Sequence, residues 1–212
     1  MLNTMSEQSP ARASRFLASL DEDWARLVCT VGPCRLETRP DREPYEALLR
    51  AIAYQQLHAK AGDAILLRLQ ALAGCFPRPA QLLATKPELL RACGFSAAKL
   101  ATVRGIAQAA LDGLVPTREE ALRLDDESLI ERLVTLKGVG RWTVEMLLIY
   151  TLERPDILPA DDFGVREGYR RLKRLAQAPT PRAMREIGQD WQPWRTAATW
   201  YLWRMPAHGW RG

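Results

Sequence analysis

The sequence has little cysteine and histidine and lacks several familiar catalytic motifs. No Cys-x-x-Cys pair occurs among its four cysteines (Cys29, Cys34, Cys75 and Cys93), and only two histidines occur in 212 residues. Zinc and iron–sulfur sites need such ligands in close clusters, so we expect buried free thiols instead. Gly-x-Ser-x-Gly, Walker and Gly-x-Gly-x-x-Gly sequences are also missing. The sequence therefore gives no support for an α/β-hydrolase, an NTPase or a dinucleotide-binding fold.

Long apolar runs are missing as well. No stretch approaches the roughly 20 residues that a membrane helix requires. Residues 1–15 are polar and contain no apolar segment of the kind found in secretion signals. We therefore expect a cytoplasmic protein without membrane contact, and a disordered tail at residues 1–15.

Hydrophobic residues make up 47% of the chain, enough for one large domain or two small lobes. Apolar residues recur with helical spacing, and period-two alternation is missing. Ser96 and Thr117 are suited to cap helices. The sequence therefore predicts an all-α protein of many short helices, among them 44–57, 60–73, 97–112, 127–135, 141–152 and 192–205.

Positive charge is concentrated near the C-terminus. Residues 166–212 carry ten Lys and Arg against three Asp and Glu, whereas residues 1–165 carry 20 against 22. A basic segment on a near-neutral body is typical of a protein that binds a polyanion. A solvated helix face explains the charge equally well, so charge alone does not decide between them.

A Gly-x-Gly turn and a pair of aspartates are the most informative features. Gly138 and Gly140 precede an apolar run, and backbone N–H groups of such a turn at a helix N-terminus can hold a phosphate. A Pro-bounded loop then brings two adjacent carboxylates, Asp161 and Asp162, to another helix start. Phosphate binding together with a carboxylate indicates an enzyme that acts on nucleic acid.

Several segments together carry a resemblance to a known family. Helix 127–135, the sequence LKGVG, helix 141–152 and the following aspartate resemble the helix-hairpin-helix motif of one DNA glycosylase superfamily. Within it, the chain is most similar to the 3-methyladenine DNA glycosylase II (AlkA-like) family. The stretches PYEALLRAIAYQQL, LRACGFSAAKLATVRGIA and WQPWRTAATWYLWR agree with this. The likeness covers about residues 40–206.

The resemblance implies a fold of two helical lobes with the active-site cleft between them. One lobe would hold residues 50–165, and the other would combine residues 1–49 with 166–212. The chain, 1–212, would form one compact glycosylase unit. Larger relatives add an N-terminal α/β subdomain, which we do not expect because only about 40 residues precede the matching region.

The resemblance also implies an activity. The enzyme would excise alkylated, cationic bases such as 3-methyladenine from double-stranded DNA by base flipping and hydrolysis, the first step of base excision repair. Relatives that also cut the strand have a lysine before the hairpin-helix threonine. Here Trp142 precedes Thr143, so we expect a monofunctional enzyme without lyase activity. Another lesion class on the same fold and a non-catalytic helix-hairpin-helix DNA-binding protein are the alternatives.

The catalytic and base-binding residues follow from the resemblance. Asp162 matches the catalytic aspartate, which stabilises positive charge on the sugar and orients or deprotonates water. Asp161 is expected to cap a helix. Trp142, Trp203 and Met146 would form the base pocket, since aromatic faces attract an electron-poor base. Met146 stands where one branch of the family has tyrosine.

The hairpin would bind the DNA backbone. The main-chain N–H groups of Gly138, Gly140 and Thr143 match those that anchor phosphate, which makes binding independent of base sequence. Apart from a monovalent cation, Na⁺ or K⁺, no cofactor is expected. By position, that cation would be bound by the carbonyl groups of Val134, Leu136 and Val139.

The QQLH turn would fill the gap that the flipped base leaves. Gln56 or Leu57 is the candidate for this role. His58, where relatives have a small polar residue, is either an exposed turn residue or a contact of the cleft. The protein is expected to be a monomer.

Overall fold

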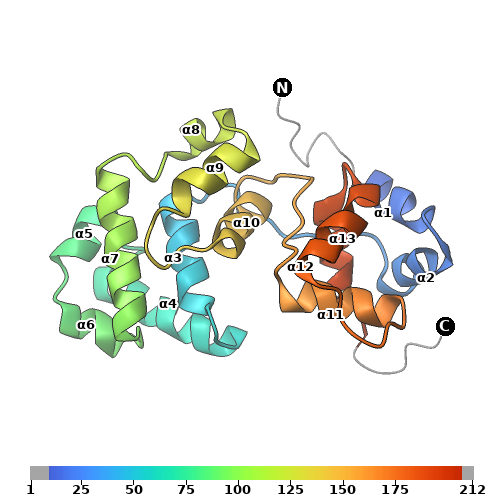
Figure 1. Ribbon diagram of the computed structural model, residues 1–212. Helices are drawn as coiled ribbons and strands as arrows, with labels where there is room; N and C mark the ends of the chain where they lie inside the picture. The colour runs from blue at the N-terminus through green and yellow to red at the C-terminus, as the bar shows by residue number, and fades with distance from the viewer. Residues whose placement is uncertain (1–9, 207–212) are drawn as a thin grey trace. The chain divides into compact units, whose positions relative to one another are not determined.

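The computed structural model describes residues 10–206, and all regular secondary structure in this range is helical (Figure 1). The all-α class expected from the sequence is therefore confirmed. The chain divides into two compact units, which we describe separately. The hairpin unit is the continuous segment Arg39–Leu152. The terminal unit combines the described residues up to Thr38 with those from Glu153 onward.

The hairpin unit is built around α3, which packs against α4, α7 and α10. Leu48, Leu49 and Ile52 of α3 are fully buried and have the helical spacing seen in the sequence. Ser96 and Thr117 cap the helices that follow them, as predicted. The helices of this unit are α3 (Pro44–Tyr54), α4 (Ala59–Ala73), α5 (Pro79–Ala84), α6 (Pro87–Ala92), α7 (Ala97–Leu111), α8 (Arg118–Arg123), α9 (Asp126–Leu133) and α10 (Arg141–Tyr150).

The terminal unit brings both ends of the described chain together around α13. Trp24 and Trp191 meet edge to face in its core, with ring centroids 5.3 Å apart. The Tyr201 hydroxyl lies 2.8 Å from both Ser14 Oγ and Gly32 O, which ties α13 to α1 and to the end of α2. The helices of this unit are α1 (Pro10–Ala18), α2 (Glu22–Val31), α11 (Phe163–Leu172), α12 (Pro181–Ile187), the short 3₁₀-helix η1 (Gly188–Trp191) and α13 (Arg195–Leu202).

The boundaries between the units lie earlier in the chain than the resemblance implied. Residues 153–165, expected in the lobe that carries the hairpin, belong to the terminal unit because α13 binds this segment. Thr196 N–H donates to Pro155 O, and the Thr196 hydroxyl accepts from Ile157 N–H, both at 3.0 Å. The terminal unit therefore positions the two adjacent aspartates singled out in the sequence.

The expected disordered tail is wrong for residues 10–15, which belong to helix α1. Ala13 and Leu17 of α1 are buried in the core of the terminal unit, at 1% and 0% exposure. Their apolar contacts stabilise a segment whose composition is mostly polar. Residues 1–9 lie outside the described residues.

The four cysteines are free thiols, but only two of them are buried. Burial raises the pKa of the Cys34 thiol to about 11, and Cys93 is buried as well. The expectation of burial is wrong for Cys29 and Cys75, which lie on exposed helix and loop positions. A single small side chain carries too little apolar surface to determine its own burial.

Much of the positive charge between residues 166 and 212 is paired within the fold. At least seven of the basic side chains form ion pairs, several of them with acids from outside this segment. Arg170 and Arg171 both bind Glu167, which lowers the pKa of that carboxyl to about 2. The charge count therefore overstates the attraction of this segment for a polyanion.

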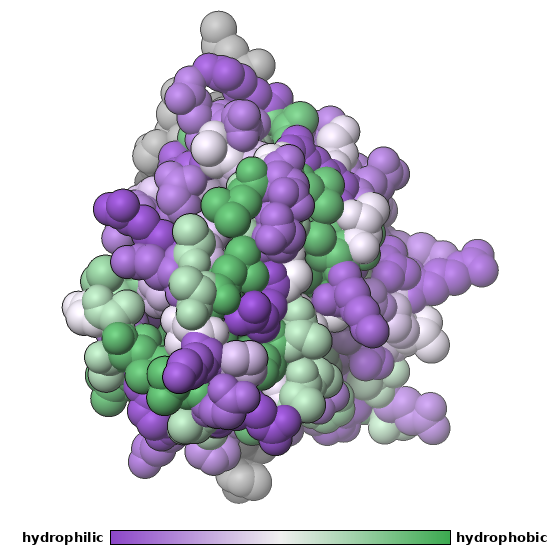
Figure 2. All heavy atoms as spheres, turned by 90° about the vertical axis from the view of Figure 1, so that its left-hand side faces the viewer, coloured by the Kyte–Doolittle hydropathy of each residue, from purple (hydrophilic) through white to green (hydrophobic). Residues whose placement is uncertain are grey.

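None of the helices within residues 10–206 has the length and apolar character needed to cross a bilayer. On the side of α5 and α6, polar residues interrupt the apolar ones (Figure 2). Scattered apolar residues of this kind are normal on a protein surface. Those exposed in the hairpin unit include Leu67, Leu72, Leu89, Leu111 and Leu114.

Candidate functional site

The hairpin between α9 and α10 requires glycine at one position for its own fold. Gly138 has a φ of +85°, and a Cβ atom here would lie 2.2 Å from Thr102 Oγ1 of α7. Both the left-handed backbone and the close approach favour glycine. Gly140 has a φ of −95°, and a Cβ atom there would meet nothing within 4 Å. The space around Gly140 is therefore open to a ligand.

Two backbone N–H groups of the hairpin can receive a phosphate. Within the described residues, the N–H groups of Gly138 and Gly140 donate no hydrogen bond, and both residues are exposed. They precede the N-terminus of α10, whose dipole favours an anion. The N–H of Thr143 instead donates to Gly140 O (2.9 Å), and Thr143 is buried. The first turn of α10 therefore already uses this donor, and a phosphate contact of Thr143 stays a prediction.

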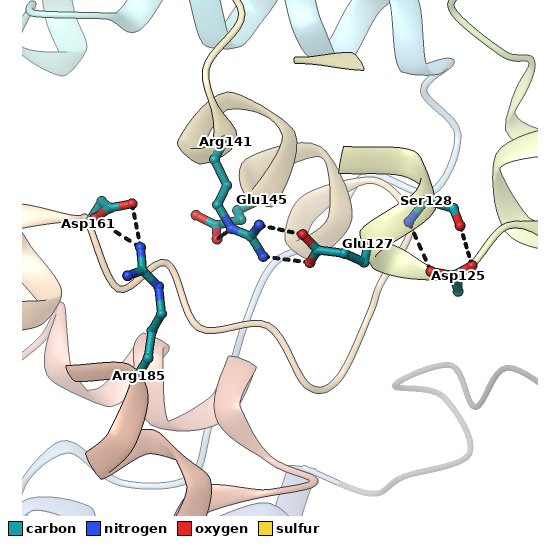
Figure 3. A network of polar contacts seen from close by, with 7 residues as sticks. All are labelled: Asp125, Glu127, Ser128, Arg141, Glu145, Asp161 and Arg185. Carbon is teal, nitrogen blue, oxygen red and sulfur yellow. Dashed lines mark hydrogen bonds and ion pairs between the residues drawn. The ribbon is translucent and has the colours of Figure 1, made fainter. Parts of the chain in front are cut away.

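Arg141 links the two helices of the hairpin (Figure 3). Its guanidinium donates to both carboxylate oxygens of Glu127 on α9, at 2.7 and 2.8 Å, and its Nε donates to Glu145 on α10 at 3.1 Å. The bond from Arg141 lowers the pKa of Glu127, and the same bond raises the pKa of Arg141. Bidentate pairs of this kind fix geometry as well as charge. This brace was not expected from the sequence, although the spacing of Arg141 and Glu145 on one helix was a usable signal.

Gln55 ties the turn after α3 to the hairpin. Its Nε2 donates to Gly138 O (3.3 Å) and to Thr143 Oγ1 (3.2 Å). From α7, Lys99 Nζ donates to the carbonyl groups of Ala53 (3.0 Å) and Gln55 (2.7 Å). These contacts hold the end of α3 beside the hairpin. No sequence pattern pointed to Gln55 or Lys99, because both act across the fold.

The next three residues of this turn are exposed. Gln56 has a φ of +56°, and the Leu57 side chain is 42% exposed, so both candidates for filling a gap in DNA lie at the surface. His58 precedes α4, and its Nδ1 accepts from Ala61 N–H at 3.3 Å. His58 is therefore an exposed helix cap, which is a more definite role than the exposed turn residue considered from the sequence.

A cavity of about 290 Å³ in the hairpin unit brings Trp142 and Met146 together. It lies between α3 and α10, and its surface is mainly apolar. Trp203, a residue of the terminal unit, is not among the residues that line this cavity. The residues around the cavity are Arg42, Ala47, Arg50, Ala51, Tyr54, Trp142, Met146, Tyr150 and Thr151.

Asp162 is fixed at the N-terminus of α11 by two donors. Its Oδ1 accepts from Val165 N–H at 2.8 Å and from the indole Nε1 of Trp203 at 2.9 Å. Asp162 is therefore the N-cap of this helix, and the helix dipole stabilises its negative charge. Gly164 leaves room for this arrangement, since a Cβ atom there would lie 3.1 Å from Trp203 Cδ1. The result is a half-buried, oriented carboxylate.

Asp161 does not cap the helix, which corrects the sequence-based expectation. It is exposed and forms an ion pair with Arg185 of α12 at 3.1 Å (Figure 3). The first helical residue of α11 is Phe163, so the N-cap position falls one residue later than expected, on Asp162. One carboxylate therefore serves both as the cap and as the candidate catalytic group.

The hairpin also carries carbonyl groups that fit a monovalent cation. Leu136 O accepts one hydrogen bond, from Val139 N–H at 3.0 Å, while the carbonyl groups of Val134 and Val139 accept none within residues 10–206. Neutral oxygen donors with open lone pairs suit hard cations. The donor set therefore agrees with the kind of ion expected.

Comparison with known proteins identifies relatives over most of the chain. The profile of the HhH-GPD superfamily base excision DNA repair proteins matches residues 49–193. DNA-3-methyladenine glycosylase 1 of Schizosaccharomyces pombe is 49% identical, covering 92% of this chain and 87% of that protein. The alkylbase DNA glycosidase-like protein mag2 of the same organism is 38% identical, covering 92% and 93%.

A solved structure supports the same relationship. It is the Schizosaccharomyces pombe 3-methyladenine DNA glycosylase in complex with abasic DNA, and it is 49% identical to this chain. The match covers 91% of this chain and 95% of that one, with a TM-score of 0.87. The family recognised in the sequence is thus confirmed. The chain belongs to the HhH-GPD superfamily of base excision DNA repair proteins.

Proposed function

We propose that this protein is a monofunctional DNA glycosylase that excises alkylated, cationic bases such as 3-methyladenine. The observation that carries this proposal is Asp162, whose carboxylate is held by Val165 N–H and by the Trp203 indole. The names of the relatives at 49% and 38% identity support the same activity. Double-stranded DNA with alkylated bases is the partner.

Asp162 would act on the sugar of the damaged nucleotide. When the N-glycosidic bond breaks, positive charge develops on the deoxyribose, and a fixed carboxylate stabilises it. The same carboxylate orients or deprotonates the attacking water. An alkylated purine leaves as a neutral base because it is already cationic in DNA. No strong general acid is needed, in agreement with a chain that has only two histidines.

The flipped base would enter the cavity lined by Trp142 and Met146. A base outside the stack regains contact area from such walls, and aromatic faces favour an electron-poor ring. The exposed Gln56 or Leu57 would occupy the gap in the duplex. The place of Trp203 in the base pocket stays a prediction, and its bond to Asp162 gives it a separate role in orienting the carboxylate.

The hairpin would anchor the DNA backbone through the N–H groups of Gly138 and Gly140. A monovalent cation, held by the carbonyl groups of Val134, Leu136 and Val139, would add positive charge next to the bound phosphate. Neither contact reads a base, so binding by the hairpin is independent of sequence. The monomeric state and the cytoplasmic location expected from the sequence stay predictions.

Incubation with methylated duplex DNA tests the proposal. We expect free methylated purines to be released and detected by chromatography, with Asp162→Asn as the inactive control. The DNA product should contain intact abasic sites that break only after alkali or heat. Tight binding without release would favour the non-catalytic alternative. If the protein released only other kinds of damaged base, it would be a glycosylase for another lesion class.

A further inference from the structure

One wall of the cavity in the hairpin unit has no role in the site described so far. Tyr54, the last residue of α3, lines it together with Trp142 and Met146 of α10. Met146 contributes a flexible thioether where one branch of the family has the ring of a tyrosine. Tyr54 is therefore an aromatic residue of this chain that can take the place of that ring.

Two residues of α4, Gly62 and Asp63, hold the side chain of Tyr54 in position. A Cβ atom on Gly62 would lie 2.2 Å from Cδ1 and 2.5 Å from Cε1 of Tyr54, so the ring edge rests on the bare Cα of this glycine. The hydroxyl donates a hydrogen bond to Oδ1 of Asp63. A side chain ordered in this way loses little conformational entropy when a ligand binds against it.

We propose that Tyr54 is a specificity-determining residue that provides the aromatic wall for the flipped, electron-poor base. This inference rests on the function proposed above. The face of an aromatic ring is negative, so it attracts a cationic ring placed against it. The charge-assisted bond from the Tyr54 hydroxyl to the Asp63 carboxylate shifts electron density into the phenol and strengthens this attraction.

The charges around the cavity make the aromatic wall more important. Arg42 and Arg50 both line the cavity, and they share one carboxylate, Glu46, at 3.7 and 2.7 Å. With Asp63, which accepts from the Tyr54 hydroxyl, the charges of these four side chains balance. No net negative charge therefore attracts a cationic base to the cavity, so the ring faces are the source of the attraction. Removal of the Tyr54 ring should therefore affect a cationic base strongly.

Four variants separate the ring from the hydroxyl and from the fold. Tyr54→Leu removes the ring, and Tyr54→Met repeats the test with an unbranched side chain in case the first variant is poorly folded. Tyr54→Phe keeps the ring and loses only the bond to Asp63. Tyr54→Leu combined with Met146→Tyr moves the ring to the opposite wall. Single-turnover excision of 7-methylguanine from a defined duplex is measured for each, together with affinity for the same duplex containing an abasic site.

Tyr54→Leu and Tyr54→Met should lower the excision rate roughly 2- to 30-fold. Tyr54→Phe should lose less than either, and the double variant should recover part of the lost rate. Affinity for abasic DNA should stay within about twofold of the wild type, because no base then occupies the cavity. If Tyr54 only supported the fold, a tyrosine at position 146 would not restore the excision rate of Tyr54→Leu.

Unchanged excision in both non-aromatic variants would overturn the inference. An equal loss of excision and of abasic-site affinity would also overturn it, since Tyr54 would then only support the fold. A wild-type protein that releases no methylated base would refute the proposed function itself, and the two failures are therefore distinguishable.

Discussion

Replacement of Asp162 by asparagine separates the charge of this residue from its role as a helix cap. The Asp162 carboxylate accepts from Val165 N–H and from Trp203 Nε1 through the same oxygen. An asparagine amide oxygen can accept both bonds, and asparagine caps helices as well as aspartate does. Asp162→Asn should therefore lower the free energy of unfolding by at most about 1 kcal/mol, through the lost attraction between the carboxylate and the helix dipole.

The loss of negative charge should be seen almost entirely in the chemical step. A carboxylate that stabilises a developing cation and activates water contributes about 10²–10⁴ to the rate, or roughly 3–5 kcal/mol of barrier. We expect a loss of this size in single-turnover excision of an alkylated purine. Affinity for abasic-site DNA should persist or rise, because one negative charge near the phosphates is gone.

Two control variants make the result specific. Asp162→Ala should unfold more easily by about 0.5–2 kcal/mol, because the cap is removed as well as the charge. Asp161→Asn removes only an exposed ion pair with Arg185, at 3.1 Å, and such pairs contribute about 0–1 kcal/mol. Its excision rate should stay within a few-fold of the wild type. Thermal unfolding and excision are measured on the same preparations.

Two outcomes would refute this reasoning. Near-normal excision by Asp162→Asn together with a large loss in Asp161→Asn would mean that the wrong carboxylate of the pair had been assigned. If neither substitution mattered, the proposed carboxylate mechanism would be wrong.

Four further predictions concern the hairpin and the start of the helix that follows it. Gly140→Ala should keep the melting temperature and weaken binding to damaged and undamaged duplexes alike. Gly138→Ala should also lower the melting temperature, because a side chain there meets α7; normal duplex binding by both variants would exclude the hairpin as the anchor. Arg141→Met should lower stability at neutral pH. Because the folded-state pKa of Glu127 is lowered, that contribution is present above its unfolded value near 4.3 and disappears as pH falls through the folded value. The difference in free energy of unfolding between the wild type and Arg141→Met should therefore shrink as the pH falls. A difference that grows in acid would contradict a stabilising role for the Arg141–Glu127 pair. Trp142 leaves no amine for a Schiff base, so borohydride should trap no protein–DNA adduct with the wild-type chain; a trapped adduct would disprove the monofunctional assignment.

Local patterns in the sequence were sufficient for most of the helices after residue 43 and for several of their starts. Ser96 and Thr117 accept from the N–H groups three residues later, as capping chemistry requires, because that interaction involves only neighbouring residues. Helix α1 was missed because its stability comes from packing against other helices, α2 and α13, and not from its own composition. Polar composition alone is a poor guide where a few residues such as Leu17 are fully buried.

In the candidate site, too, local sequence patterns indicated some residues and missed those that act across the fold. The glycine pattern indicated Gly138, since turn conformation leaves a mark in the sequence. Asp162 was assigned through the family resemblance, whereas the expected helix cap fell on Asp161, one residue too early. Gln55 and Tyr54 left no such mark. Each acts through residues distant in sequence or through space that a glycine leaves open, as at Gly62. Ion pairing of the basic C-terminal residues also depends on which acids the fold brings near them.

The path of the chain has a consequence for the order in which the protein folds during synthesis. Arg39–Leu152 is one continuous insert, and its ends are joined by a 2.7 Å hydrogen bond from Arg39 N–H to Tyr150 O. All of its core contacts are complete once residue 152 has left the ribosome. The terminal unit must wait, because α1 and α2 pack on helices translated after the insert. We therefore expect the hairpin unit to fold first, while Trp24 of α2 remains without Trp191 until the segment that follows the insert has been synthesised. A nascent chain that stops before α13 would thus expose an apolar surface that chaperones bind.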